Sequence, residues 1–144
     1  MDTVMAKLTP VREEILSIIE DAGIPVNVSV IMDTLTSTPN ISTVYRALDY
    51  FERNQYVHSI SLSGMRYYYG SSRGGHGHFL FCRECRELIT FDDCIVHTLQ
   101  KKLQKQYEYQ ISSHVLFFEG LCGECGKLQH KKSQSIFSGE RGKR

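Results

Sequence analysis

Two Cys-x-x-Cys pairs constrain this chain more than any other feature of its sequence. Cys82 and Cys85 form the first pair, Cys122 and Cys125 form the second, and 36 residues lie between the pairs. Both sulfurs of such a turn can approach one ion, so two turns supply the four thiolates of a tetrahedral zinc site. Four thiolates leave no position open for a substrate. We therefore expect a structural zinc that joins the two ends of the intervening segment.

The number of cysteines argues against one alternative to a zinc site, a set of disulfide bonds. The chain has five, and an odd number, in a sequence that begins without the pattern of an export signal, argues against a disulfide framework. A redox-active Cys-x-x-Cys motif and simple buried thiols remain as alternatives. The fifth cysteine, Cys94, is interpreted as a small apolar residue.

Length and composition favour a small globular protein. Of the 144 residues, 41% are hydrophobic and 23% are charged, which is an ordinary composition for a globular chain. A chain of this length is too short for a large enzyme. No apolar run approaches the roughly 18 residues of a membrane-spanning helix. We therefore expect a cytoplasmic protein that does not bind a membrane.

The first half of the chain has the pattern of three helices and a hairpin. Helices are predicted over residues 10–22, 28–35 and 43–55. Thr9 caps the first helix, with Pro10 at its first position, and Ser42 caps the third. Residues 58–70 alternate between polar and apolar side chains and turn at Ser63 and Gly64, as in a two-stranded hairpin. This order of elements is typical of a winged helix-turn-helix domain.

The second half has the pattern of a small α/β domain. Strands are predicted over residues 78–82, 87–91 and 111–122, and a helix over residues 93–106. The apolar strands would leave exposed edges that a second copy could cover, so we expect a homodimer. The polar, glycine-rich stretch 71–75 predicts a linker. The expected fold class is α/β, with a winged helix-turn-helix domain over residues 1–73 and a small α/β dimerisation domain, stapled by a zinc bound to four cysteines, over residues 74–126.

The basic charge of the chain is concentrated at its end. The net charge is only +1, but residues 127–144 hold six basic residues and one acidic residue. Their polar composition predicts a basic, disordered tail. Such a tail could add weak attraction for phosphate, or it could keep the protein soluble without a specific role.

The third predicted helix has the side chains of a DNA-reading element. In the major groove an arginine can bond guanine, and an aromatic ring can contact a thymine methyl group, so we interpret Tyr45 and Arg46 as base readers. The alternatives are a core tyrosine and a solvated surface arginine. The residues suited to bind phosphates are Lys7, Arg12, Ser42 and Thr43. Arg12 is equally suited to brace the first helix.

These residues resemble those of a known family. The run Ile41–Leu48 reads ISTVYRAL, Thr-Pro-Val-Arg stands ahead of it at residues 9–12, and a His-x-His motif precedes the first cysteine pair. Together with the closing cysteine pair, this combination is similar to the ferric uptake regulator family over about residues 5–126. The resemblance implies a dimeric, metal-responsive repressor that binds a palindromic double-stranded DNA operator. It also implies a structural zinc, and a second metal site between the domains that sets the spacing of the DNA-binding domains.

The resemblance further implies which histidines form this regulatory site. When the chain is aligned with the family between the two cysteine pairs, the matching residues are His76, His78, His97 and His114. A His-x-His motif on a strand directs both imidazoles to one face, which suits capture of one ion. His97 lies off the apolar stripe of its predicted helix, which suits a ligand and equally a plain surface side chain. His58 and His130 are interpreted as residues of the wing surface and of the tail.

The same alignment implies that another metal site of the family is lost. At its ligand positions this chain has Ile24, Gly70, Gly77, Phe79 and Thr90, whose side chains do not coordinate with useful strength. Asp92, two residues beyond Thr90, could substitute only if the strand shifts. We therefore expect one regulatory site per protomer.

The donor atoms bear on the identity of the regulatory metal. Four neutral imidazoles favour zinc, nickel, cobalt or copper(II) over manganese. Zinc is our first choice and iron(II) our second, which keeps an iron-loaded regulator of peroxide stress as the alternative within the family. Because imidazole protonates near pH 6.5, metal affinity should fall as the pH drops through that region.

Two other classes of protein are alternatives to a metal-dependent repressor. Several histidines could hold a catalytic zinc, but no carboxylate lies beside the His-x-His motif as an evident general base, and half of the chain forms a winged helix. We therefore do not expect an enzyme. The other class is a zinc-stapled DNA-binding module without metal sensing, whose DNA affinity would respond only to removal of the thiolate-bound zinc.

Overall fold

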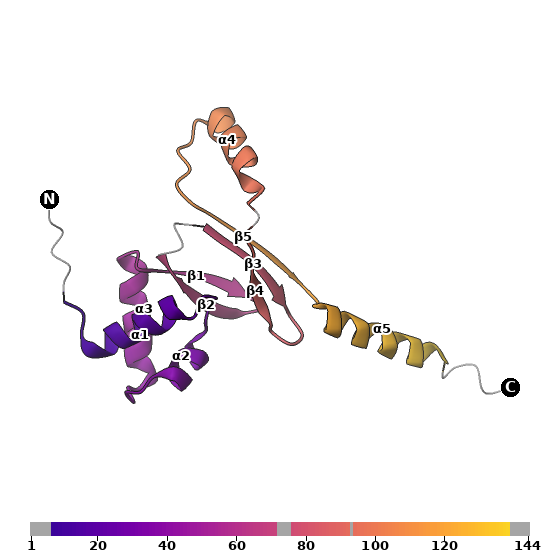
Figure 1. Cartoon of the computed structure of the whole chain (residues 1–144), viewed down its shortest axis with the longest axis horizontal. Helices are drawn as coiled ribbons and strands as arrows, with labels where there is room; N and C mark the ends of the chain where they lie inside the picture. The colour runs from indigo at the N-terminus through magenta and orange to yellow at the C-terminus, as the bar shows by residue number, and fades with distance from the viewer. Residues whose placement is uncertain (1–6, 72–75, 93, 139–144) are drawn as a thin grey trace. The chain divides into compact units, whose positions relative to one another are not determined.

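A computed structural model describes residues 7–71, 76–92 and 94–138 (Figure 1). The chain divides into two compact units. The first contains three helices and a two-stranded hairpin, and the second contains two helices and nearly all of a three-stranded sheet. The domain boundary predicted near residue 73 lies outside the described residues. Within the described ranges, no helix is long and apolar enough to cross a membrane.

Side-chain caps start the helices of the first unit. The three helices are α1 (Pro10–Asp21), α2 (Val28–Thr34) and α3 (Ile41–Arg53). Oγ1 of Thr9 accepts a hydrogen bond from the backbone N–H of Arg12 at 3.4 Å, and Pro10 follows where no N–H is needed. In α2, Oδ1 of Asn27 accepts from the backbone N–H of Val30 at 3.0 Å. The predicted cap of α1 is confirmed.

The helix α3 begins two residues earlier than predicted, because its N-cap is Asn40 and not Ser42. Oδ1 of Asn40 accepts hydrogen bonds from the backbone N–H of Thr43 and from the hydroxyl groups of Ser42 and Thr43, each at 2.9 Å. The prediction that Ser42 caps the helix is therefore wrong. Asparagine caps helices at least as well as serine, and the sequence offers both in succession.

Apolar side chains at helical spacing form the core of the first unit. The fully buried members on the helices include Ile15, Ile31, Val44, Leu48 and Phe51. Tyr68 of the hairpin packs among them, and its backbone exchanges hydrogen bonds of 2.9 and 2.7 Å with the backbone of Val26. Each such side chain contributes about 1.5–3 kcal/mol of burial free energy. The core therefore holds α3 in place and leaves its opposite face in solvent.

The hairpin has the predicted position and turn. Its strands are β1 (Val57–Leu62) and β2 (Met65–Gly70), which pair antiparallel. The two turn residues, Ser63 and Gly64, have φ values of 47° and 76°. A two-residue turn with both φ angles positive matches the twist of the flanking strands. With the three helices, the hairpin completes a winged helix.

The second unit is built on a three-stranded sheet. Its strands are β3 (His76–Cys82), β4 (Leu88–Thr90) and β5 (His114–Gly120), and β3 lies between the other two (Figure 1). The antiparallel register sets Phe79 opposite Thr90. Phe79 and Phe81 are buried while Leu80, between them, is exposed, which is the alternation expected of a strand with one covered face. The expected α/β fold class is confirmed.

Two helices complete the second unit. They are α4 (Val96–Tyr107), which has no buried residue, and α5 (Gly123–Ser138). Residues 127–138 thus continue a helix that starts at the second cysteine pair, and the prediction of a disordered tail is wrong for this stretch. Polar composition alone does not separate an exposed helix from disorder, and lysine and glutamine are good helix formers. Residues 139–144 lie outside the described residues.

Candidate metal centres and nucleic-acid interface

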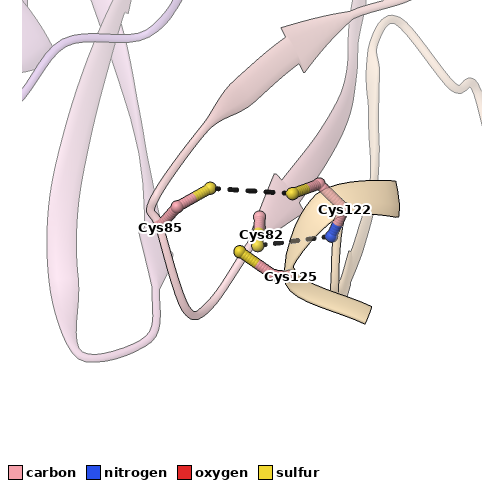
Figure 2. A group of neighbouring side chains, drawn as sticks. All are labelled: Cys82, Cys85, Cys122 and Cys125. Atoms are coloured by element: carbon pink, nitrogen blue, oxygen red, sulfur yellow. Dashed lines mark hydrogen bonds between the residues drawn. The ribbon is translucent and has the colours of Figure 1, made fainter. Parts of the chain in front are cut away.

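Four cysteine side chains converge in the second unit, as Figure 2 shows. Cys82 ends β3 and Cys85 lies in the turn after it, while Cys122 directly precedes α5 and Cys125 lies in its first turn. Their Sγ atoms all lie within 4.8 Å of one another. The Sγ atoms of Cys85 and Cys122 are 3.8 Å apart. Two sulfurs bound to one tetrahedral zinc at about 2.3 Å lie about 3.8 Å apart, so the group fits such an ion.

The polypeptide backbone favours ionisation of one of these thiols. The backbone N–H of Cys122, 3.3 Å from Sγ of Cys82, and the backbone N–H of Cys85 lower the pKa of the Cys82 thiol to about 6. The adjacent Cys122 side chain and burial raise the pKa of Cys125 to about 12. Neighbouring thiolates repel one another, so the four do not ionise together without a cation between them. A divalent ion that accepts sulfur ligands removes this conflict.

A second group of candidate ligands contains two of the four histidines of the predicted regulatory site. His78 lies in β3, and His114 is the first residue of the neighbouring strand β5. A ring nitrogen of each lies within 4.8 Å of the other and of Sγ of Cys94. His78 is only 8% exposed, and its ring stacks on that of Phe91 with the centroids 5.3 Å apart. The structure therefore brings together two imidazoles and one thiol.

Among the described side chains, the predicted ligand His97 is not a member of this group. His97 lies in the first turn of α4, with an exposed side chain. The side chain of His76 lies outside the described part of the structure. Asp92 is exposed, and no group of three potential ligands found among the described residues includes it. The ligand roles of His76 and His97 stay predictions.

Cys94 is the residue that the sequence interpretation missed at this group. It was interpreted as a small apolar residue, because it belongs to neither cysteine pair and no regular spacing connects it to a histidine. The pairing of β3 with β4 and the path of the chain into α4 bring it near His78. Only a register for these two strands could have revealed the proximity.

The solvent face of α3 has the side chains predicted to read bases. Its exposed residues include Ser42, Tyr45, Arg46, Asp49 and Arg53. Tyr45 is 49% exposed, so it is not a core tyrosine. Arg53 forms an exposed ion pair with Asp49 at 3.6 Å, one turn along the helix. The face therefore offers hydrogen-bond donors, an acceptor and an aromatic ring to the same side.

A small hollow lies beside this face, between α1 and α3. It is lined by Thr9, Val11, Arg12, Thr43, Arg46 and Ala47. The guanidinium of Arg12 lies over the ring of Tyr50 at 4.0 Å from its centroid, which fits the bracing role considered for it. Lys7 is exposed just ahead of α1. Two arginines thus share one hollow at the amino-terminal ends of two helices.

A groove between α3 and the hairpin contains residues that the sequence interpretation did not select. Besides the predicted base reader Tyr45, its lining residues include Asp49, Met65 and Arg66. Arg66 also contacts Glu52 of α3, at 3.0 Å between Nη2 and Oε1. These residues lie on different elements with no shared motif, so no sequence pattern marks them.

Comparison with known proteins identifies similar chains. The model of the ferric uptake regulator family matches residues 4–119. The ferric uptake regulation protein of Campylobacter jejuni is 29% identical over 91 residues, which are 63% of this chain and 58% of that protein. The match thus spans less than two thirds of the length of that relative.

Two solved structures agree with the architecture. The Helicobacter pylori ferric uptake regulator, described as having three functional metal-binding sites, is 27% identical with a TM-score of 0.65, over 83% of this chain and 82% of that one. The Vibrio cholerae ferric uptake regulator, described for a rearrangement of its DNA-binding domains, is 26% identical with a TM-score of 0.68, over 81% and 92%.

Proposed function

Because the chain belongs to the ferric uptake regulator family, we propose that it is a metal-dependent, DNA-binding transcriptional repressor of metal homeostasis. One observation carries the proposal. A single chain joins a winged helix that exposes Tyr45 and Arg46 on its third helix to two groups of potential metal ligands. A metal-dependent repressor needs both parts, since metal binding has to alter DNA affinity.

In this proposal α3 enters the major groove of double-stranded DNA. Arg46 bonds the N7 and O6 atoms of guanine, and Tyr45 contacts a thymine methyl group. Asp49 lies on the same exposed face. Its carboxylate is repelled by phosphates and can accept a hydrogen bond from N4 of cytosine, so it suits a place over the bases.

Positively charged residues near the hollow between α1 and α3 bind the phosphates. Lys7 precedes α1 and Arg12 lies in its first turn, and the N-terminus of this helix adds partial positive charge. Ser42 and Thr43 were also predicted to bind phosphates, but both hydroxyl groups donate to Asn40 in the structure. Each must rotate away from Asn40 before it can donate to DNA, which makes it a weaker phosphate ligand than the two cations.

The four cysteines hold a structural zinc in this proposal. Cys82, Cys85, Cys122 and Cys125 supply only sulfur, and their sulfurs lie close enough together to bind one tetrahedral ion. Among the described residues, no carboxylate or imidazole belongs to the group. Zinc at this point joins the turn after β3 to the start of α5. Because the free energy of binding a structural zinc is also folding free energy, the metal contributes directly to the folding of the second unit.

The histidines hold the regulatory metal. His78 and His114 form its centre, with the predicted ligands His76 and His97 available from β3 and α4. Zinc is the metal that these donors favour first, and iron(II) the second. The ion promotes DNA binding only by as much as it prefers the DNA-competent arrangement, typically about 1–3 kcal/mol.

The active form is a homodimer that binds a palindromic operator. Large apolar side chains of the second unit stand in solvent: Ile95 is 80% exposed, Phe118 55% and Leu99 52%. An apolar surface of this kind is typical of a protein interface. Two copies related by two-fold symmetry present two α3 helices, which match the two half-sites of a palindrome. The protein acts in the cytoplasm, where the DNA of such regulators lies.

Two alternatives remain within the same architecture. An iron-loaded regulator of peroxide stress is disfavoured because the group around His78 contains sulfur and nitrogen donors and, among the described residues, no carboxylate. A zinc-stapled module without metal sensing would need the proximity of His78 and His114 to be incidental. An enzyme is not favoured by any observation.

One experiment tests the proposal. DNA affinity is measured against buffered free zinc and ferrous iron, with a chelator weak enough to leave one zinc per protomer in the cysteine site. We expect zinc to raise the affinity for cognate DNA by about 5–150-fold. An affinity that changes only when the cysteine-bound zinc is stripped contradicts metal sensing and favours the zinc-stapled module.

A further inference from the structure

The group around His78 contains a sulfur that the family comparison does not assign. We propose that Cys94 supplies a thiolate ligand to the regulatory metal, so that two imidazoles and one sulfur bind an ion of the zinc class. This inference rests on the proposed function, because it names a ligand and the metal class of the same site.

The distances suit coordination of one ion. The candidate ligand atoms of His78, Cys94 and His114 all lie within 4.8 Å of one another. With metal–nitrogen bonds of about 2.0–2.1 Å and a metal–sulfur bond of about 2.3 Å, nitrogen and sulfur in a tetrahedral site lie about 3.5 Å apart. The gap to be closed is at most about 1.3 Å, which small side-chain torsions provide.

The local fold holds Cys94 at this place. The backbone N–H of Phe91 donates to the carbonyl oxygen of His78 at 3.2 Å, and the rings of these two residues stack. Cys94 follows three residues later, directly before Ile95, the N-cap of α4. The contact between Phe91 and His78 therefore fixes the start of the connection that places Cys94 beside the imidazole.

The surroundings of Cys94 fit a ligand better than a core residue. Its side chain is half-buried, and the next residue, Ile95, is 80% exposed. A thiol that only filled apolar space would lie among buried apolar side chains. Instead its sulfur lies within 4.8 Å of a ring nitrogen of each of two imidazoles, one of them, His78, buried.

The sulfur changes which metals the site selects. Thiolate and imidazole together favour zinc, whereas manganese prefers carboxylate, carbonyl and water oxygens. A site with one sulfur and two nitrogens therefore discriminates against manganese and against the oxygen-rich coordination of an iron site. The expected order of affinity is zinc above iron(II) above manganese(II).

Cobalt(II) is the probe that tests this ligand. The full chain is prepared with zinc in the cysteine site, cobalt(II) is titrated, and zinc content is measured afterwards to show that the cysteine site has not exchanged. A thiolate ligand gives a sulfur-to-cobalt charge-transfer band in the near ultraviolet, and imidazole ligands alone do not. We expect one cobalt per protomer with this band in the wild type.

Three variants complete the experiment. Cys94→Ser should lose the band and bind cobalt more weakly by more than about 100-fold, beyond the roughly 10–100-fold loss when a residue that only orients a ligand is removed. Cys94→His should keep cobalt and lose the band, which tests the same point if the serine variant folds poorly. Thr98→Ala, an exposed change in the same segment, should match the wild type.

The outcomes separate this inference from the proposed function. Cobalt that binds the wild type without the band, or a band that persists in Cys94→Ser, overturns the role of Cys94. If DNA affinity still rises with cobalt in that case, the proposed function stands. If no metal binds beyond the cysteine-bound zinc and DNA affinity does not respond, both fail.

Discussion

Arg66 of β2 donates a hydrogen bond from Nη2 to Oε1 of Glu52 on α3 at 3.0 Å. The same carboxylate oxygen accepts from the hydroxyl of Ser59 on β1, and Nε of Arg66 donates to that hydroxyl oxygen at 2.9 Å. One polar network thus joins the base-reading helix to both strands of the wing. It fixes the orientation of two elements that are proposed to contact DNA at different places.

Glu52→Gln tests this network. The amide keeps the size of the side chain but removes the negative charge that Arg66 contacts, so we expect a loss of about 1 kcal/mol in the free energy of unfolding and a severalfold loss of DNA affinity. Urea unfolding and DNA titration measure the two effects. Asp49→Asn is the stability control, because it weakens only the exposed pair with Arg53 and should cost about 0.5 kcal/mol or less. Equal losses in the free energy of unfolding for both variants would contradict the account.

Glu14 is expected to make stability depend on acid. Hydrogen bonds from the hydroxyl of Ser37, and then from the hydroxyl and backbone N–H of Thr36, lower the pKa of Glu14 from 4.5 to about 2. A lowered folded-state pKa stabilises the protein fully above pH 4.5, and this contribution disappears as the pH falls toward 2. It ties α1 to the turn before α3.

The matched variants are Glu14→Gln and Glu13→Gln, the second of which alters an exposed carboxylate on the same helix. Urea unfolding of each is compared with the wild type at pH 6 and pH 3. We expect Glu14→Gln to be less stable than Glu13→Gln at pH 6 and the gap to narrow at pH 3. A gap that does not change with pH would show that the Glu14 charge is not the cause.

Substitution of Arg46 and substitution of Lys7 should weaken DNA binding in different ways. Arg46→Ala removes a proposed guanine contact, so it should weaken specific binding by about 1–3 kcal/mol and relax the preference at one operator position. Lys7→Ala removes a proposed phosphate contact, so it should weaken binding to all sequences alike and reduce the salt slope by about 1. Affinities for cognate and scrambled DNA at several salt concentrations separate the two. An unchanged preference in Arg46→Ala would remove its role as a base reader.

Loss of one sulfur from the cysteine site should unfold the second unit selectively. Cys122→Ser leaves three thiolates and removes the sulfur that lies 3.8 Å from Sγ of Cys85. We expect zinc loss and disappearance of the dimer, while the winged helix keeps its own buried core. Zinc content, sedimentation and hydrogen exchange measure these properties. A zinc-free variant that still dimerises would contradict a structural role for the metal.

The winged helix could be predicted from the sequence because helix caps and turn residues specify its elements locally. Thr9 and Pro10 start α1 where predicted, and a turn with positive φ at Ser63 and Gly64 forms the wing. The error at α3 has a local cause as well, since Asn40 and Ser42 are both good caps and only the structure shows which oxygen the backbone of Thr43 contacts.

The metal-binding unit could be predicted only in part from the sequence. The cysteine pairs were recognisable because a sharp turn fixes the two sulfurs of each pair close together. Cys94 was not, because its approach to His78 depends on strand pairing between β3 and β4. The helix α5 was missed because exposed polar helices and disordered tails share a composition, so the sequence could not separate them.

The central claim is that a histidine site, separate from the cysteine-bound zinc, controls DNA affinity. The most direct measurement is the metal content of the wild type and of a His78→Ala, His114→Ala variant, paired with DNA affinity against free zinc. We predict that the wild type holds one metal more per protomer than the variant and that only the wild type gains affinity with zinc, by about 5–150-fold. A variant that keeps the full metal content and the full zinc response would contradict the account.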